Sequence, residues 1–293
     1  MGGTKIEILV LDGQGHEMLR KRIPTPKEDY QAILNAISSL VNESEEQLNL
    51  KCSIGVGTPG SFSPDSNLLR NSNSICLNGK PVKQDLEKTL DREIRITNDA
   101  NCFALSEAVD GAAKDANAVF GVILGTGVGA GIVINKKVLV GCNAIAGEWG
   151  HNPLPWPDQN ELELTKCWCG RRGCIETFLS GAGLENDFEQ LAKFKLSAKE
   201  INLQAEKGSP AAAKAMQIYE NRLAKSLAHI INILDPDVIV LGGGLSNINR
   251  LYEVVPGIWN EWIFSECIIT KLMPPSHGDS SGVRGAAWLW EMS

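Results

Sequence analysis

The sequence has 293 residues, 43% of them hydrophobic, and a formal net charge of −7. This length and composition are typical of a folded protein with two domains. The negative charge and the absence of a basic run of five residues argue against nucleic-acid binding and favour a small-molecule partner. Eight cysteines without a signal peptide, three of them closely spaced, favour a reducing cytoplasm.

The first hundred residues alternate between predicted strands and helices, and glycine-rich turns lie beside two of the strands. The predicted elements are strands at 6–11, 18–23, 53–57 and 94–97, and helices at about 28–42 and 82–90. A Gly-Gly-Thr turn at 2–4 can wrap a phosphate with its backbone N–H groups and the Thr4 hydroxyl. The glycines of the second turn, Gly-Thr-Pro-Gly at 57–60, let the backbone approach a ligand.

Asp99 lies between the strand at 94–97 and a predicted helix at 102–109. An aspartate at such a junction is most often only the N-cap of the helix. Open α/β sheets, however, bind ligands beyond the carboxyl ends of their strands. We therefore interpret Asp99 as a carboxylate that accepts a proton from a substrate hydroxyl.

The apolar run 118–134 is nearly long enough to cross a membrane, but it contains five glycines and Thr126. We predict buried strands at 119–124 and 132–134 instead. The glycines between them match the G-x-G-x-x-A pattern of dinucleotide-binding dehydrogenases. That pattern should open a helix, whereas β-branched residues follow here and predict a hairpin. The turn at Thr126 and Gly127 could still hold phosphate.

Residues 147–176 contain the donors of a closed tetrahedral zinc site, three thiols and one imidazole. The predicted ligands are His151, Cys167, Cys169 and Cys174. Such a site shapes a loop and does no chemistry itself. The alternative is that these cysteines are reduced core residues, but C-x-C-x₄-C rich in Gly and Arg is a poor core pattern. A metal here would bring Glu148 and Glu176 together.

The remainder of the chain is mainly helical. Helices are predicted at 182–192, 200–206, 210–232 and 283–290. A buried strand at 238–241 ends in Gly242-Gly243-Gly244, where bare backbone would let a base or ribose lie against the turn. A tight turn with no further role is the alternative.

The order of these motifs resembles that of the ROK family of sugar kinases and repressors. The motifs are Gly-Gly-Thr-Lys at 2–5, Gly-Thr-Pro-Gly at 57–60, Asn-Asp-Ala-Asn at 98–101, Gly-Thr-Gly at 125–127, Glu-Trp-Gly-His at 148–151, the cysteine motif at 167–176 and the glycines at 242–244. Residues 73–79, 148–156 and 277–290 are most similar to bacterial fructokinases of the manno(fructo)kinase type. No helix-turn-helix precedes the first turn, which favours the kinase branch.

The resemblance implies the hexokinase/actin/RNase H-like fold, with two α/β domains and the active site in the cleft between them. The small domain would comprise 1–113 plus 282–293, and the large domain 114–281. The implied activity is phosphorylation of a hexose by ATP with Mg²⁺, with fructose favoured over N-acetylglucosamine, mannose or glucose. A non-catalytic sugar sensor and, more weakly, a zinc-dependent DNA-binding protein are alternatives. Family members are commonly homodimers.

The resemblance also implies a role for each site residue. Asp99 would be the general base toward the 6-hydroxyl of the sugar. Residues expected to hold the sugar are Asn98, Glu148, His151 and Glu176. Residues expected to line the nucleotide are Thr4, Lys5, Thr126, Gly127, Gly243 and Gly244. Zinc would bind one ring nitrogen of His151 and so fix its tautomer.

One motif departs from the family. Its first motif is Asp-x-Gly-Gly-Thr at the end of a first strand, and here Met1 stands in the x position. We therefore expect that a few preceding residues would complete this strand and supply the acidic residue that helps to position Mg²⁺. The chain as given is expected to be poorly stable and nearly inactive.

Overall fold

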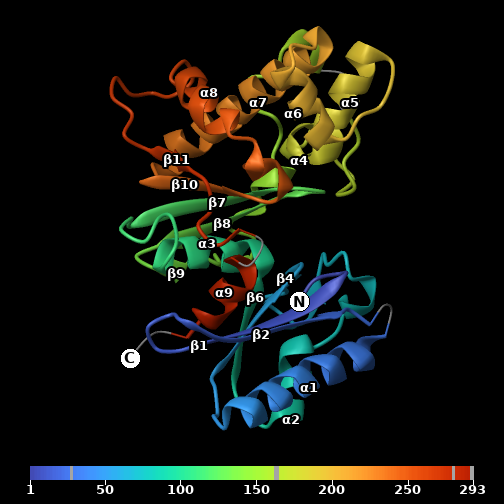
Figure 1. Cartoon of the computed structure of the whole chain (residues 1–293), viewed down its shortest axis with the longest axis vertical. Coiled ribbons are helices and arrows are strands. Elements are labelled where there is room, and N and C mark those ends of the chain that lie inside the picture. The colour runs from blue at the N-terminus through green and yellow to red at the C-terminus, as the bar shows by residue number, and fades with distance from the viewer. Residues whose placement is uncertain (27–28, 162–164, 279–280, 291–293) are drawn as a thin grey trace.

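The computed structural model describes residues 1–26, 29–161, 165–278 and 281–290. A five-stranded sheet crosses its middle (Figure 1). Its strands, in spatial order, are β11 (Lys271–Met273), β10 (Val238–Gly242), β7 (Ala118–Leu124), β8 (Val128–Ile134) and β9 (Lys137–Val138). β7 and β8 form the predicted antiparallel hairpin, and β10 runs parallel to β7. The hairpin excludes the dinucleotide-binding interpretation, which requires a helix there.

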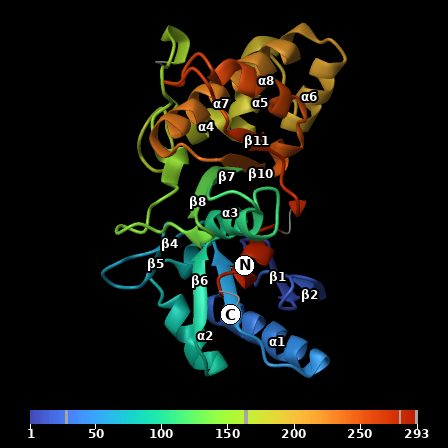
Figure 2. The same cartoon turned by 90° about the vertical axis from the view of Figure 1, so that its left-hand side faces the viewer.

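Helices cover both faces of this sheet, with one group above it and another helix packed against its lower face (Figures 1 and 2). The upper group contains α4 (Ile175–Leu179), α5 (Gly181–Ala192), α6 (Ala198–Glu206), α7 (Pro210–Leu234) and α8 (Arg250–Trp259). The lower helix is α3 (Asp99–Val109). The buried apolar side chains of α7, which include Leu223 and Leu227, pack in one core with Val122 and Leu124 of β7.

The N-terminal part contains shorter sheets. Its strands are β1 (Lys5–Leu11) paired antiparallel with β2 (Glu17–Pro24), β3 (Ile54–Thr58) paired parallel with β6 (Ile94–Asn98), and β4 (Ser61–Phe62) paired with β5 (Leu69–Arg70). Its helices are α1 (Tyr30–Leu48) and α2 (Val82–Leu90). Ile33 and Leu34 of α1 share a buried core with Ile94 of β6.

Two helices lie between the sheets, α3 and the C-terminal α9 (Ser281–Ala287) (Figure 1). Glycines let their backbones touch neighbours directly. A Cβ atom at Gly285 of α9 would lie 1.6 Å from the Cys102 oxygen of α3, and one at Gly55 of β3 would lie 1.7 Å from the Ala286 oxygen of α9. No side chain larger than hydrogen fits at either position, so α9 packs tightly on both elements.

The predicted strands and helices are present in the predicted order, with differences at some element ends. Elements that were not predicted are the helices α4 and α8 and the short strands β4, β5, β9 and β11. α1 continues beyond its predicted end at residue 42 and ends at Leu48. Residues 43–48 include good helix formers, but they lack the apolar periodicity on which the prediction relied. Its predicted start at Glu28 lies outside the described residues, and Asp29 is the N-cap. α9 ends at Ala287, not at 290.

The membrane alternative for residues 118–134 is wrong, because β7 and β8 occupy them. Among the helices of the described ranges, none combines the length and the apolarity needed to cross a membrane.

The two-domain division stays a prediction, and residues 291–293 of its small domain lie outside the described ranges. Phe103 and Leu105 of α3 share a core with Val119 and Val240 of the five-stranded sheet. α3 therefore packs against the sheet that the prediction assigned to the other domain.

A bidentate ion pair fastens the end of α1 to the chain beyond α2. The Arg92 guanidinium donates to both carboxylate oxygens of Glu45, at 2.7 and 2.8 Å, and the Cys52 backbone N–H donates to the same carboxylate at 2.9 Å. Only 6% of the Glu45 side chain is exposed. The bonds to Arg92 hold the pKa of Glu45 at about 2, below its usual 4.5.

We expect Glu45→Gln to lower the free energy of unfolding at pH 7 by about 1–3 kcal/mol, because the Arg92 charge loses its partner. A carboxyl group with a lowered pKa contributes stability above its usual pKa, and that contribution disappears as the pH falls from about 4.5 to about 2. The variant should therefore lose less stability over this range. Urea unfolding at several pH values measures both effects, with Glu46→Gln on the exposed side of the same helix as control. Equal acid sensitivity of wild type and Glu45→Gln would contradict the assignment.

Candidate functional site

Asp99 is the first residue of α3, directly after β6. Asn98, not Asp99, is the N-cap: its side-chain oxygen accepts from the Ala100 N–H at 2.8 Å, and its amide nitrogen donates to the Gly60 oxygen at 3.0 Å. Asp99 accepts from the same Ala100 N–H at 2.9 Å through one carboxylate oxygen. Asn98 therefore performs the capping, and the Asp99 carboxylate keeps acceptor capacity for a ligand.

The surroundings of Asp99 favour its protonated form more than water does. Desolvation by nearby protein atoms raises the pKa of Asp99, and the negative charge of Glu148 raises it further. The Ala100 N–H and the Met1 amine act in the opposite direction. Because the residue also keeps contact with solvent, the shift is smaller than for an enclosed carboxyl group. A carboxylate with a raised pKa is a better proton acceptor.

Glycines of β8 bring the start of α3 close to the five-stranded sheet. A Cβ atom at Gly131 would lie 2.6 Å from the Ala100 oxygen, and one at Gly129 would lie 3.5 Å from the Ala100 Cβ. These two glycines therefore allow close packing beneath Asp99. The sequence interpretation treated the glycine run only as a ligand turn and missed this role.

The four predicted zinc ligands lie together. The donor atoms of His151, Cys167, Cys169 and Cys174 are all within 4.8 Å of one another. The Cys167 Sγ is 3.6 Å from the His151 Nδ1, and the Cys169 Sγ is 3.7 Å from the Cys174 Sγ. Donors bound to one tetrahedral zinc ion at about 2.1–2.3 Å lie about 3.5–3.8 Å apart. The donor set and its spacing therefore fit zinc in a closed structural site.

Glu176 joins this cysteine cluster to the β7–β8 turn. Its carboxylate accepts from the Val128 backbone N–H at 3.0 Å and from the Trp168 indole N–H at 2.7 Å. A Cβ atom at Gly127 would meet the same carboxylate at 2.8 Å. Trp168 also makes an edge-to-face contact with the His151 ring, with centroids 4.9 Å apart. Nothing in the sequence pattern indicated this role of Trp168.

Glu148 begins a short 3₁₀ helix (Glu148–His151) that carries the imidazole ligand. Glu148 is exposed, and its negative charge contributes to the raised pKa of Asp99. The 3₁₀ helix and the start of α3 both pack against β8. The cysteine loop, Glu148 and Asp99 therefore belong to one part of the molecule although they come from distant parts of the chain.

The glycine turns at 125–127 and 242–244 follow β7 and β10, which are neighbouring parallel strands. The two turns therefore meet at the carboxyl ends of these strands. Gly243 has φ = 80°, and a Cβ atom there would lie 2.3 Å from the Leu124 oxygen. Gly244 and Thr126 are exposed beside it. Ligands bind at this edge in open α/β sheets. The structure thus brings the predicted turns at 125–127 and 242–244 together.

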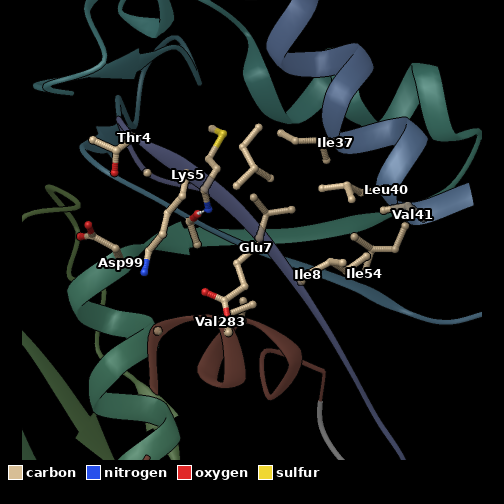
Figure 3. Close-up of a pocket in the computed structure, with 18 residues that line it drawn as sticks. Thr4, Lys5, Glu7, Ile8, Ile37, Leu40, Val41, Ile54, Asp99 and Val283 are labelled. Atoms are coloured by element: carbon tan, nitrogen blue, oxygen red, sulfur yellow. Dashed lines mark hydrogen bonds between the residues drawn. The ribbon is translucent and has the colours of Figure 1, made fainter. Parts of the chain in front are cut away.

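Thr4 and Lys5 lie elsewhere, at the start of β1. They line a cavity together with Asp99 (Figure 3), and Thr126 and Gly243 are not among its lining residues. The six residues predicted to line the nucleotide therefore form two groups, one beside Asp99 and one at the edge of the five-stranded sheet.

The fold and these motifs define the ROK family, and the chain belongs to it: the family profile matches residues 1–293. Among the solved structures, the ROK hexokinase of Thermus thermophilus is 27% identical with a TM-score of 0.87, over 98% of this chain and 95% of that one. A ROK glucokinase from Streptomyces griseus, solved with glucose and AMPPNP, is 25% identical with a TM-score of 0.80, over 100% and 98%. The predicted actin-like α/β fold is confirmed.

Curated relatives are more similar in sequence. N-acetyl-D-glucosamine kinase of Citrobacter koseri is 39% identical over 99% of this chain and 97% of its own length. The protein of that name from Vibrio atlanticus is 40% identical over the same shares. These relatives differ from the fructokinases that the sequence motifs suggested.

We expect the purified protein to hold about one zinc ion per chain, because its four donors match a closed tetrahedral site. Cys174→Ser should lose the metal and unfold at a lower temperature, since the loop loses its frame. Elemental analysis and thermal unfolding measure both effects. Cys142→Ser, at an exposed cysteine outside the cluster, should retain wild-type zinc content. Wild-type protein that is free of metal and equally stable would refute the zinc site.

Proposed function

We propose that the protein is an ATP-dependent sugar kinase that phosphorylates the 6-hydroxyl of N-acetylglucosamine. The observation that carries the proposal is the identity of 38–40%, over 99% of the chain, to proteins named as N-acetyl-D-glucosamine kinases. The sequence motifs favoured fructose and kept N-acetylglucosamine as an alternative. The relatives support that alternative, and the glucokinase solved with glucose and AMPPNP supports a sugar and ATP as ligands.

In the proposed reaction Asp99 is the general base. It accepts the proton of the 6-hydroxyl as that oxygen attacks the γ-phosphorus of ATP, and the bond from phosphorus to the bridging oxygen of ADP breaks. Two features suit Asp99 to this role: the neighbouring Asn98 caps the helix, and desolvation raises the pKa of Asp99. Asn98 is also proposed to hold the sugar beside the base.

Glu148, His151 and Glu176 are proposed to hold the other sugar hydroxyls. Zinc, when bound, would fix the loop. Nδ1 of His151 lies 3.6 Å from the Cys167 Sγ and is the nitrogen proposed to bind the metal, which leaves Nε2 for a hydroxyl. The ionised Glu176 carboxylate can only accept hydrogen bonds, and it already accepts one from the indole N–H of Trp168. The Trp168 side chain is 69% exposed, so a sugar hydroxyl can replace its indole N–H without uncovering a core.

The two glycine turns are proposed to hold the nucleotide. Thr126 and the backbone of Gly127 would contact the phosphates, while Gly243 and Gly244 would lie against the adenosine. Thr4 and Lys5, which line a cavity together with Asp99, are proposed to contact the phosphoryl group that is transferred. Mg²⁺ bound to the phosphates supplies charge neutralisation.

Asp99→Asn should lower turnover by roughly 10²–10⁴-fold, the usual effect of losing a general base. Sugar affinity should change little, because an amide can still hydrogen-bond a hydroxyl. ADP release and calorimetric titration with sugar separate the two quantities. Asp115→Asn, at an exposed aspartate outside the site, should behave as wild type. Turnover above half of the wild-type value in Asp99→Asn would remove Asp99 from this role.

Among N-acetylglucosamine, fructose, mannose and glucose, we expect N-acetylglucosamine to give the highest kcat/KM, by about tenfold or more. A site that hydrogen-bonds an acetamido group leaves its polar groups unpaired when that group is absent. Coupled measurement of ADP with each sugar tests this preference. Equal or faster turnover of fructose would restore the fructokinase interpretation, and sugar binding without ADP release would indicate a non-catalytic sensor.

A further inference from the structure

A hydrogen bond from Arg70 joins two parts of the candidate site that are far apart in the sequence. Arg70 lies in β5, and its Nη2 donates to the backbone oxygen of Asn143 at 2.9 Å. Asn143 belongs to the loop 139–147, which connects β9 to Glu148. The Arg70 side chain therefore reaches from the β4–β5 hairpin to the loop that leads into one of the residues proposed to hold the sugar.

The backbone of Arg70 is connected to Asn98. Arg70 pairs with Ser61 in the β4–β5 hairpin. A Cβ atom at Gly60, the residue before β4, would lie 2.5 Å from the Arg70 backbone oxygen, so the two backbones touch. The Gly60 oxygen accepts from the side-chain amide of Asn98 at 3.0 Å. Since Asn98 caps α3, these contacts fix the hairpin relative to Asp99, the first residue of that helix.

Loop 139–147 is anchored at its end and exposed in its middle. Gly147 packs directly against the backbone of β8, whereas residues 139–143 are exposed. The Glu148 N–H donates to the Ile145 oxygen at 3.1 Å, so the position of the loop affects that of Glu148. Exposed segments with few buried apolar contacts open easily. A bond to the middle of the loop therefore restricts its motion and that of Glu148.

The Arg70 guanidinium holds its position at a cost in free energy. Its Nε is buried, and no hydrogen-bond partner for it occurs among the described residues. The same is true of the Oγ of Ser61, its partner across the hairpin. Unpaired buried polar groups lower the stability of the folded state. Stability of the hairpin therefore does not explain this arginine, which favours a role in the site.

We propose that Arg70 is a positioning residue for the sugar. It holds loop 139–147 against the β4–β5 hairpin, and so keeps Glu148 and Asn98 within reach of the same sugar. This inference rests on the proposed kinase function, in which both residues hold the substrate. The long side chain spans the gap between hairpin and loop, and a charged donor makes a stronger hydrogen bond than a neutral one. Because the acceptor is a backbone oxygen, the side chain of Asn143 has no part in the contact.

The first test uses hydrogen exchange of the free protein and needs neither sugar nor ATP. Arg70→Ala should speed amide exchange in residues 139–148 by at least about fivefold, because the loop loses its bond to the hairpin. Exchange in β7 should stay unchanged. Lys88→Ala, at an exposed lysine of α2, also removes a positive charge and should behave as wild type. Unchanged exchange of the loop in Arg70→Ala would overturn the proposal, as would faster exchange throughout the protein.

The second test measures steady-state kinetics with N-acetylglucosamine. Arg70→Ala should raise the KM for the sugar about 5- to 20-fold and change kcat by less than about threefold, because the bond positions a residue that holds the sugar before and during the reaction. The KM for ATP should stay the same. Arg70→Lys keeps a charged donor and should recover part of the sugar affinity. Asn143→Ala should retain the wild-type KM, since it leaves the backbone oxygen in place.

The kinetic results can contradict the positioning role in three ways. These are a lower kcat at unchanged KM, an equal rise in the KM for sugar and for ATP, and a loss of sugar affinity in Asn143→Ala. A wild-type protein that releases no ADP with any of the four sugars would overturn the proposed function, and the role of Arg70 toward a sugar with it. The exchange measurement separates these cases, because it reports on the contact between Arg70 and the loop without turnover.

Discussion

The fold depends on direct backbone contact between helices and strands around α3. Gly131 of β8 brings the sheet against the first turn of α3, and Gly285 of α9 brings the last helix against the Cys102 carbonyl on the same helix. A methyl group at either place would overlap backbone atoms, which cannot move aside as a side chain does. α3 is therefore held from both sides, and its first residue, Asp99, is fixed relative to the five-stranded sheet.

The loop that carries the cysteine cluster is connected to the rest of the candidate site through Glu176, and not only through the four predicted zinc ligands. This carboxylate bonds the Val128 N–H, so the position of the loop is tied to the β7–β8 turn that carries Thr126. A single loop thus orients Glu176, one of the residues proposed to hold the sugar, and contacts the neighbouring turn that is proposed to hold phosphate. Through these few hydrogen bonds, binding of the sugar would change the affinity for the nucleotide, and binding of the nucleotide would change the affinity for the sugar.

Sequence patterns predicted the features that depend on residues close to one another in the chain. Hydrophobic periodicity located most of the longer helices and strands but missed α8, and the cysteine spacing located a cluster that the structure brings together. Long-range packing was not predictable: Gly55 and Gly131 are small because another backbone touches them, and nothing near them in sequence shows that. Trp168 was missed for the same reason, since its partner Glu176 is set by how the loop folds. The choice among hexoses came from whole-chain similarity, because short motifs carry family features shared by all its members.

The position of α9 has a consequence for how the protein is made. Arg284 donates to Asp110 and to the Gly15 carbonyl, and Trp290 donates to the Ile54 carbonyl, so the last residues of the chain tie down the first. These C-terminal residues are synthesised long after the strands that they contact. The N-terminal strands therefore keep apolar faces uncovered until α9 has emerged from the ribosome. Chaperones have the longest access to the part of the chain that is synthesised first.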